Sequence, residues 1–463
     1  MRRTQVAVIG AGSAGLNAFR QARKHTDSVL LIDPGPLGTT CARVGCMPSK
    51  LLIAAADAAW SARHADALGV QVGDIRIDGP AVMKRVRGMR DKFVSKVLNG
   101  MSGIPEEAQL HQSVRFIADQ LLETADGEKI EAERVVIATG SRPAIPRFLY
   151  NADDRLLVND DLFELTDLPQ SVVVFGPGVI GLELGQALHR LGVRVRMFGV
   201  GGAIGPLGDA ELLACAAETF GAEYPLDADA EATKVERTAA GVCVTFSDHQ
   251  GQQQTENFDY LLAATGRRPN VDNLGLENTS LELDEHGIPL FDTETLQCSN
   301  TPVFIAGDAN NHLPLLHEAS DEGHIAGDNA GRYPDVRPGH RTVPLAVVFS
   351  DPQIATVGMT ATKIAQYDAR LVATASLSFS NVARAKVLNR TEGVMKVWAD
   401  RKTGKLLGAE LLGPDVEHLA HLLAWAMERG QTLDEMLAMP YYHPVLEEGI
   451  RSLLRELKTA MQE

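Results

Sequence analysis

Two copies of one pattern decide the fold of this chain. The first copy runs Val6-Ala7-Val8-Ile9-Gly10-Ala11-Gly12-Ser13-Ala14-Gly15, and the second runs Val172-Val173-Val174-Phe175-Gly176-Pro177-Gly178-Val179-Ile180-Gly181. Their glycines recur at a constant offset of 166 residues (176 minus 10 for the first pair). Each copy reads as an apolar strand, a Gly-x-Gly-x-x-Gly turn, an amphipathic helix and a second strand. The repeat predicts an α/β protein with two Rossmann-like domains.

The glycines of such turns favour a dinucleotide, because they let the backbone approach a pyrophosphate whose charge the following helix N-terminus stabilises. One motif alone is a weak signal, since glycines also serve ordinary tight turns, but two copies in strand–helix–strand context make the prediction firm. The candidate binding residues are Gly10, Gly12 and Gly15 in the first copy and Gly176, Gly178 and Gly181 in the second.

An acidic residue is expected where the second strand of each copy ends, because its carboxylate accepts hydrogen bonds from ribose hydroxyls. Asp33 fills that position in the first copy, although it also suits the turn at Pro34-Gly35. The equivalent position in the second copy is Gly199, so the carboxylate typical of NAD selectivity is missing there. No arginine lies between Gly199 and Gly208 to bind the 2′-phosphate of NADP. The choice between NAD and NADP stays open.

A pair of cysteines, Cys41 and Cys46, follows the first repeat. In a regular helix, residues five apart lie about 8–9 Å from each other, whereas a disulfide needs Cα atoms about 4.4–6.8 Å apart. The pair can therefore close only where the backbone departs from a helix, which Gly45 makes easier. Pro48 suits a helix start, which places Cys46 near a helix N-terminus that favours its thiolate. From spacing alone, redox-active cysteines, inert cysteines and a metal site all remain open, although Ser49 stands where an iron–sulfur loop needs a third cysteine.

Length and charge exclude several classes of protein. A chain of 463 residues is too long for one core and predicts about three domains. A net charge of −16 disfavours a nucleic-acid partner. No apolar run approaches the ~20 residues of a membrane span, the start offers no signal peptide, and five cysteines do not suggest a secreted disulfide framework. We expect a cytoplasmic protein with no membrane or nucleic-acid partner and no metal.

Further strand ends divide the chain. Gly140 and Gly266 follow two similar apolar strands that turn through Gly and Pro. Another apolar strand ends in Gly307-Asp308 after the second repeat, so returning chain is expected to complete the first domain. The chain from Thr342 on reads as strands followed by helices. The predicted division is 1–150 for the first part of the first dinucleotide domain, 151–270 for the second domain, 271–341 for the return segment and 342–463 for an α+β C-terminal domain.

His443 and Glu448 lie near the C-terminus, in Tyr442-His443-Pro444-Val445-Leu446-Glu447-Glu448. Pro444 suits a helix start, which would put His443 at the cap and Glu448 in the first turns. Taken alone, His443 reads as a surface residue or as a general acid–base group. Glu448 alone reads as a carboxylate favoured by a helix N-terminus.

Together these segments resemble the flavoprotein disulfide reductases over essentially the whole chain, and most closely the dihydrolipoamide dehydrogenases. The matching motifs are Gly10-x-Gly12-x-x-Gly15 with Asp33, Cys41-x-x-x-x-Cys46-x-Pro48-Ser49-Lys50, Ala138-Thr139-Gly140, Gly176-x-Gly178-x-x-Gly181-x-Glu183, Gly266-Arg267-x-Pro269-Asn270, Gly307-Asp308, Leu316-His317 and His443-Pro444-x-x-x-Glu448. The resemblance implies FAD at the first repeat and at Asp308, a nicotinamide nucleotide at the second repeat, and a C-terminal dimerisation domain.

The resemblance also implies roles for single residues. Cys41 would exchange with the substrate and Cys46 with the flavin, and His443 would serve the disulfide of the other subunit of a homodimer as its acid–base group, oriented by Glu448. Lys50 and Glu183 match an ion pair near the flavin, and Leu316-His317 a segment that contacts it. Tyr441, Tyr442 and Val445 depart from the pattern at the substrate mouth.

The implied enzyme is an FAD-dependent dithiol/disulfide oxidoreductase of the dihydrolipoyl dehydrogenase type. Its expected reaction oxidises dihydrolipoamide with NAD⁺ through a Cys41–Cys46 disulfide, and a lipoyl domain of a 2-oxo acid dehydrogenase complex is a candidate partner. The alternatives are an NAD(P)H-dependent reductase of another small disulfide, such as a glutathione-like one, and a soluble transhydrogenase or quinone reductase. NADP is not excluded.

Overall fold

The computed structural model describes residues 1–230, 232–248 and 250–462, and divides into two compact units, each built from three segments of chain. The first unit holds Met1–Pro48, Arg87–Ala144 and Arg267–Arg341, and the second holds Ser49–Val86, Ile145–Gly266 and Thr342–Glu463. Helices α3 (Cys46–Arg63) and α4 (Gly79–Met101) have residues in both units. The four domain boundaries given above stay a prediction.

The first unit is built on a seven-stranded sheet of order β3-β2-β1-β6-β5-β4, with β17 paired to β6. Strands β1, β2, β3, β6 and β17 run parallel, and β4 and β5 add an antiparallel edge. The strands are β1 (Arg2–Ile9), β2 (Val29–Ile32), β3 (Gln109–Leu110), β4 (Val114–Ala118), β5 (Leu121–Thr124), β6 (Lys129–Ile137) and β17 (Val303–Ile305), beside the small pair β7 (Ser141–Pro143) and β16 (Arg267–Pro269).

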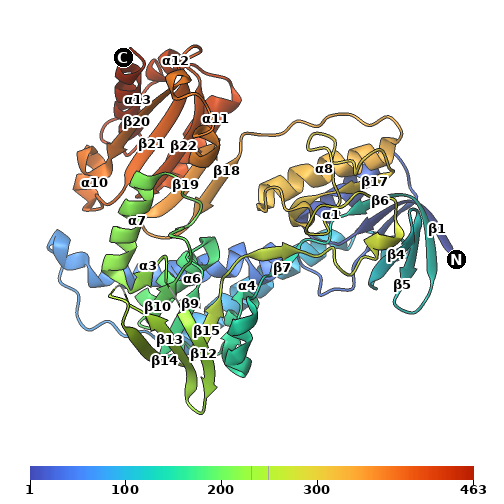
Figure 1. Ribbon diagram of the computed structural model, residues 1–463, viewed down its shortest axis with the longest axis horizontal. Helices are drawn as coiled ribbons and strands as arrows, with labels where there is room; N and C mark the ends of the chain where they lie inside the picture. The colour runs from blue at the N-terminus through green and yellow to red at the C-terminus, as the bar shows by residue number, and fades with distance from the viewer. Residues whose placement is uncertain (231, 249, 463) are drawn as a thin grey trace. The chain divides into compact units, whose positions relative to one another are not determined.

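Returning chain completes the first unit. Strand β17 pairs with β6 through Val303–Ile305, and helix α8 (Leu316–Arg332) lies beside α1 (Ser13–Ala22) (Figure 1). The two helices approach closely through glycine, because a Cβ at Gly323 would come within 2.3 Å of the Ala14 carbonyl oxygen. The short elements of this unit are α2 (Thr40–Val44), η2 (Glu106–Ala108), η4 (Leu276–Asn278) and η5 (Gly307–Asn310).

The second unit contains the other dinucleotide-type sheet, of five parallel strands in the order β11-β10-β9-β15-β8. Its elements are η3 (Arg147–Arg155), β8 (Leu156–Leu157), α5 (Asn159–Leu162), β9 (Ser171–Phe175), α6 (Val179–Arg190), β10 (Arg194–Phe198), α7 (Ala210–Glu223), β11 (Leu226–Asp227) and β15 (Tyr260–Ala263), with the antiparallel sheet β12 (Ala232–Thr238), β13 (Gly241–Ser247) and β14 (Gln253–Phe258), and η1 (Ala65–Leu68).

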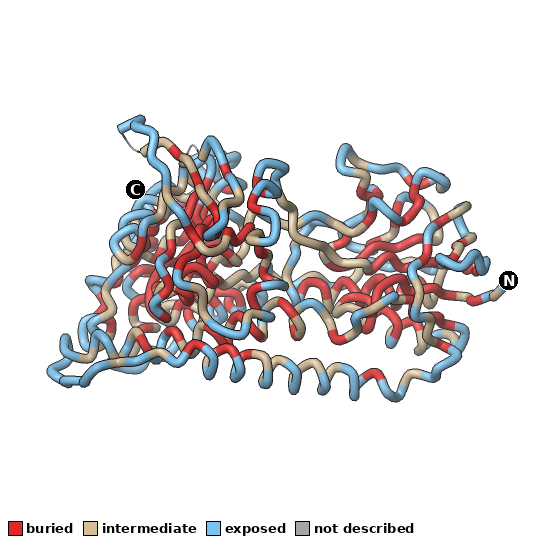
Figure 2. Tube along the Cα trace, turned by 90° about the horizontal axis from the view of Figure 1, so that it is seen from below, coloured by how far each residue is buried: buried red, intermediate tan, exposed pale blue. Residues whose placement is uncertain are grey.

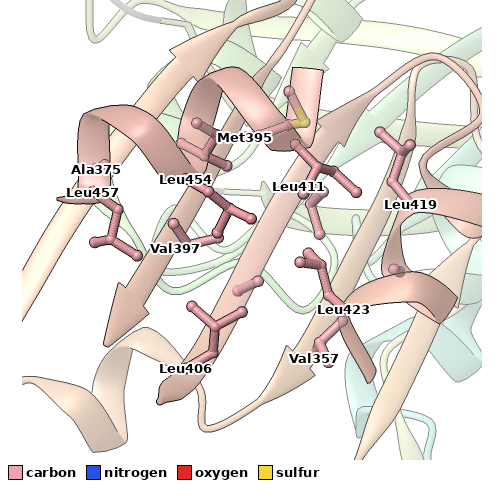
Figure 3. Packing of buried hydrophobic residues seen from close by; sticks show 14 of the residues in the cluster. Val357, Ala375, Met395, Val397, Leu406, Leu411, Leu419, Leu423, Leu454 and Leu457 are labelled. Atoms are coloured by element: carbon pink, nitrogen blue, oxygen red, sulfur yellow. The ribbon is translucent and has the colours of Figure 1, made fainter. Parts of the chain in front are cut away.

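The rest of the second unit is an antiparallel sheet of order β18-β19-β22-β21-β20 with helices packed on it. The elements are β18 (Leu345–Val348), β19 (Gln353–Gly358), α9 (Ala361–Ile364), η6 (Ala369–Leu371), β20 (Val372–Ser378), η7 (Phe379–Asn381), α10 (Ala383–Leu388), β21 (Val394–Asp400), β22 (Leu406–Gly413), α11 (Val416–Glu428), α12 (Leu433–Leu437) and α13 (Glu448–Ala460). Buried leucines of α11 and α13 meet inward side chains of the sheet such as Val397 and Leu411 (Figure 3).

Both predicted repeats form as strand, turn, helix and strand, because their strands carry runs of buried apolar residues, α1 buries part of its surface and α6 is buried over most of its length. Buried stretches run through the interior of the chain and exposed ones lie on its outside (Figure 2). The predicted helix start at Pro444 is wrong. Residues 443–447 form turns, and α13 begins only at Glu448. None of the helices in the described part of the chain has the length and apolarity that a bilayer crossing needs.

Candidate functional site

The first glycine turn connects β1 to α1, and its three glycines differ in how much space surrounds them. A Cβ on Gly10 would lie 2.2 Å from the carbonyl oxygen of Ala138, and one on Gly15 would lie 1.8 Å from that of Gly10. A Cβ on Gly12 would meet nothing within 4 Å. Gly10 and Gly15 are therefore required by the close packing of the turn, whereas Gly12 leaves open space at the start of the helix.

The second turn, between β9 and α6, repeats this geometry almost atom for atom. A Cβ on Gly176 would lie 2.3 Å from the carbonyl oxygen of Ala264, and one on Gly181 would lie 1.9 Å from that of Gly176. Gly178 again faces open space. In both copies the bare middle glycine lies at a helix N-terminus, where the backbone can approach a phosphate. The residues present fit a dinucleotide at each turn.

Groups around the first turn support the same conclusion. The carboxylate of Asp33 accepts hydrogen bonds from the backbone N–H of Ala11 at 2.6 Å and of Gly35 at 2.7 Å, so it braces the glycine turn as well as its own. The hydroxyl of Thr139 is buried with no partner among the described residues, so it is available to a ligand bound at this turn. Beside it, a Cβ on Gly140 would face open space.

Asp308 lies in a chain of hydrogen bonds that joins three segments of the first unit. Its carboxylate accepts from the hydroxyl of Ser141 at 2.7 Å, and that hydroxyl accepts from Nε of Arg267 at 2.8 Å. Gly266 leaves open space where a Cβ would lie. Leu316 and His317, which begin α8, are both exposed. No sequence motif indicated that Ser141 holds Asp308.

The two cysteines lie on either side of a break in the helix. Cys41 belongs to α2, which ends at Val44. Gly45 follows with φ −120° and ψ −121°, and Cys46 is the first residue of α3. A Cβ on Gly45 would lie 3.1 Å from the Cα of Cys41, so a larger residue there would crowd the first cysteine. The predicted departure from a regular helix is confirmed. Helix α3 starts two residues before Pro48, and Cys46 lies in its first turn, where the helix dipole favours a thiolate.

Lys50 and Glu183 form the predicted ion pair, at 2.7 and 2.8 Å between Nζ and the two carboxylate oxygens. Glu183 is buried in α6, and its carboxylate also accepts from the hydroxyl of Ser49 at 3.2 Å and from the backbone N–H of Phe349 at 3.0 Å. The Phe349 ring lies under the ammonium, 4.5 Å from Nζ to the ring centre. Three donors therefore hold this carboxylate through four hydrogen bonds, and two of these donors, Ser49 and the N–H of Phe349, were not predicted from the sequence.

His443 and Glu448 also meet. Nδ1 of His443 lies 2.8 Å from Oε2 of Glu448, at the start of α13. The imidazole is largely exposed, and its side chain keeps 71% of its accessible surface. A carboxylate on Nδ1 fixes the ring orientation and leaves Nε2 to exchange protons with a substrate. The two cysteines lie in the first unit and His443 lies in the second. The geometry of the cysteine segment and that of the His443–Glu448 pair are therefore each described within their own unit.

Comparison with known proteins extends these observations to the whole chain. Residues 4–323 match the family described as pyridine nucleotide-disulphide oxidoreductase, and residues 344–454 match its dimerisation domain, which supports a homodimer. The dihydrolipoyl dehydrogenase of Bacillus subtilis is 31% identical over 457 residues, covering 96% of this chain and 94% of the relative. The mercuric reductase of Streptomyces lividans is 30% identical over 463 residues, covering 99% and 95%.

Solved structures agree on the fold. LpdA from Mycobacterium tuberculosis has a TM-score of 0.81 with 28% sequence identity and covers 99% of this chain and 100% of its own. The flavoprotein disulfide reductase RclA from Escherichia coli, at 23% identity and 97% and 99% coverage, has a TM-score of 0.81 and shows the fold alone. Because these relatives carry different names, they leave the substrate open. The chain belongs to the pyridine nucleotide-disulphide oxidoreductases and is a flavoprotein disulfide oxidoreductase that uses FAD and a pyridine nucleotide.

Proposed function

We propose that this protein oxidises dihydrolipoamide to lipoamide with NAD⁺ through a redox disulfide formed by Cys41 and Cys46. The observation that carries the proposal is the helix break at Gly45, which separates the two cysteines and starts α3 at Cys46. Relatives named dihydrolipoyl dehydrogenase, at 30–32% identity over almost the full chain, support the choice of dithiol.

The dithiol chemistry is an exchange in two steps. One thiolate of the substrate attacks Sγ of Cys41, the Cys41–Cys46 bond breaks, and Cys46 leaves as a thiolate. The second substrate thiol then displaces Cys41, which closes the cyclic disulfide and leaves both cysteines reduced. The substrate loses two electrons and two protons, and the cysteine pair gains the two electrons. FAD, when bound, carries these electrons onward to the nicotinamide as a hydride.

In this proposal His443 moves the protons. Nε2 takes a proton from the attacking thiol, while Glu448 on Nδ1 stabilises the imidazolium that results. The resemblance assigns His443 to the cysteine pair of the other subunit, which the dimerisation domain makes possible. Cytoplasmic localisation and a lipoyl domain as the natural carrier of the dithiol belong to the same proposal.

Each glycine turn and the residues around it are assigned to one of the two cofactors. The first glycine turn, with Asp33, Gly140, Asp308 and the Leu316-His317 segment, would hold FAD, and the Lys50–Glu183 pair would lie near the flavin. The second glycine turn and Gly266 would hold the nicotinamide nucleotide. The open space at Gly12 and Gly178 supports both assignments, since each leaves room for a pyrophosphate.

A second candidate substrate is a glutathione-like disulfide, reduced by NAD(P)H. It is favoured by Tyr442, a residue that is 80% exposed directly before His443, because its bulk would hinder a lipoyl domain more than a small disulfide. Sequence departures at Tyr441 and Val445 lie in the same segment.

Turnover of the FAD-loaded protein with two disulfides and two nucleotides tests the proposal. Lipoamide and oxidised glutathione are each assayed with NADH and NADPH. We expect rapid reduction of lipoamide by NADH, which is the reverse of the proposed reaction. Cys41→Ser should lose at least about a thousandfold in rate, because in this direction the Cys41 thiolate attacks the lipoamide disulfide. Turnover of oxidised glutathione alone would favour the second candidate. Absence of turnover with either disulfide would overturn the assignment.

A further inference from the structure

The carboxyl edge of the parallel sheet in the second unit is where a nucleotide is expected to lie. Strands β10 and β11 follow β9 on one side of the sheet, and β15 lies on the other side, so the strand order reverses at β9. Ligands of such sheets bind beside this reversal, outside the carboxyl ends of the strands. Phe175, Phe198 and Asp227 are aligned partners at the ends of three neighbouring strands. The residues that follow them line one edge.

Gly199, which follows β10, cannot carry the acidic side chain usual at that position. A Cβ there would lie 2.6 Å from the carbonyl oxygen of Ala228 and 2.6 Å from Cγ of Pro177. Neither neighbour can yield, because one is backbone and the other is a ring inside the glycine turn. The missing carboxylate is thus a consequence of how tightly this edge is packed.

The loop after β11 lies against the loop after β10 and carries carboxylates of its own. The backbone N–H of Gly199 donates to the Asp227 carbonyl at 2.7 Å, and that of Ala230 donates back to Gly199 at 3.0 Å. Oδ1 of Asp229 accepts from the N–H of Gly201 at 2.7 Å. These bonds hold the exposed residue Asp229 beside the loop after β10, where the usual acidic residue is replaced by Gly199.

Together, the loops that follow β10 and β11 carry negative charge and no positive charge. Residues 199–208 contain no lysine or arginine, and neither does the segment 225–230, which contributes Asp227 and Asp229. Oδ1 of Asp227 accepts from the N–H of Asp229 at 3.2 Å. Oδ2 of Asp229 has no hydrogen-bond partner in the described part of the chain. A ribose hydroxyl could donate to such an oxygen, whereas a 2′-phosphate would be repelled by the Asp229 carboxylate.

We propose that Asp229, in the loop after the neighbouring strand β11, replaces the missing acid at Gly199, binds the adenosine ribose of the nicotinamide nucleotide and selects NAD(H) over NADP(H). The inference rests on the assignment of the second glycine turn to that nucleotide. A single residue outside the usual position would then determine the preference for NAD(H) over NADP(H). It also explains why Gly199 and the absence of arginine occur together in this chain.

Equilibrium binding tests the inference without turnover. The probes are ADP-ribose and 2′-phospho-ADP-ribose, measured by titration calorimetry on the FAD-loaded protein. Asp229→Asn keeps an oxygen for the N–H of Gly201 and removes only the charge. We expect the parent to prefer ADP-ribose, and Asp229→Asn to reduce this preference at least about tenfold, the effect of one lost charge-assisted hydrogen bond. Asp227→Asn is the matched control and should change the preference less than about threefold.

Gly178→Val separates failure of the inference from failure of the nucleotide assignment, because its side chain fills the open space at the turn. We expect it to weaken both probes. If it weakens neither, the second turn is not the nucleotide site and the assignment itself fails. If it weakens both while Asp229→Asn leaves the preference unchanged, only the role of Asp229 is overturned. If Asp227→Asn reduces the preference as much as Asp229→Asn does, selectivity comes from the total negative charge of the two loops. That result would also overturn the specific role of Asp229.

Discussion

At the scale of single residues, Glu183 shows how much the site depends on one buried carboxylate. Lys50, Ser49 and the backbone N–H of Phe349 all donate to it, at 2.7–3.2 Å. The sequence motifs predicted the pairing with Lys50. They could not predict the backbone donor, because Phe349 reaches Glu183 through the tertiary fold from 166 residues away. Such a carboxylate ties α6 to α3 and to the C-terminal segment.

Removing this carboxylate should destabilise the second unit strongly. In Glu183→Ala, the N–H of Phe349 loses its acceptor and the partly exposed Lys50 loses its counter-charge, at an expected cost of about 3 kcal/mol in the free energy of unfolding. Chemical denaturation of the FAD-loaded protein measures the change. Glu236→Ala, which breaks the exposed pair with Lys234, is the control and should cost less than about 1 kcal/mol. Equal losses in the two variants would contradict this account of Glu183.

At the scale of elements, buried runs and glycine spacing were enough to predict both repeats, since each strand and turn is determined locally. Helix ends that depend on tertiary contacts could not be predicted from such local patterns. Pro444 suits a helix start, yet α13 begins at Glu448. The buried cluster around Arg190, at the end of α6, gave no sequence signal at all. Its guanidinium bonds to Glu223 of α7 at 2.8 Å and to Asp351 at 2.9 Å, and lies 4.2 Å from the Trp60 ring of α3.

The Arg190 cluster makes the second unit sensitive to acid. Burial alone would raise the pKa of Asp351, but the charges of Arg190 and Arg390 outweigh it and hold that pKa below its ordinary value of 3.8. The stabilisation from Asp351 is therefore present above pH 3.8 and is lost as the pH falls through its lower folded-state pKa. In Arg190→Met the folded-state pKa should rise, so acid unfolding should begin at a higher pH.

Circular dichroism during an acid titration measures this shift. Arg370→Met is the matched control, because Arg370 is largely exposed and bonds only to Asp368 among the described residues. It should leave the acid midpoint unchanged. An Arg190→Met midpoint equal to that of the parent would show that the cluster does not govern acid stability.

At the scale of the whole molecule, the proposed reaction requires two nucleotide turns, a cysteine pair and a His–Glu pair. The repeats and the family resemblance predicted these parts, and the structure shows the close packing of both glycine turns and the contacts of the Lys50–Glu183 and His443–Glu448 pairs. The disulfide between the two cysteines stays a proposal. The sequence could not give the substrate, since relatives with the same motifs include a dihydrolipoyl dehydrogenase and a mercuric reductase. What unites the account is the claim that electrons pass through Cys41 and Cys46.

Differential alkylation of the FAD-loaded protein, read by mass spectrometry before and after anaerobic addition of NADH, tests that claim most directly. Cys215 and Cys298 serve as internal references, because burial raises the pKa of their thiols and slows their reaction. The account predicts that Cys41 and Cys46 become reactive together on reduction and are protected again when lipoamide is added. Unchanged labelling of both cysteines after complete reduction of the flavin would contradict it.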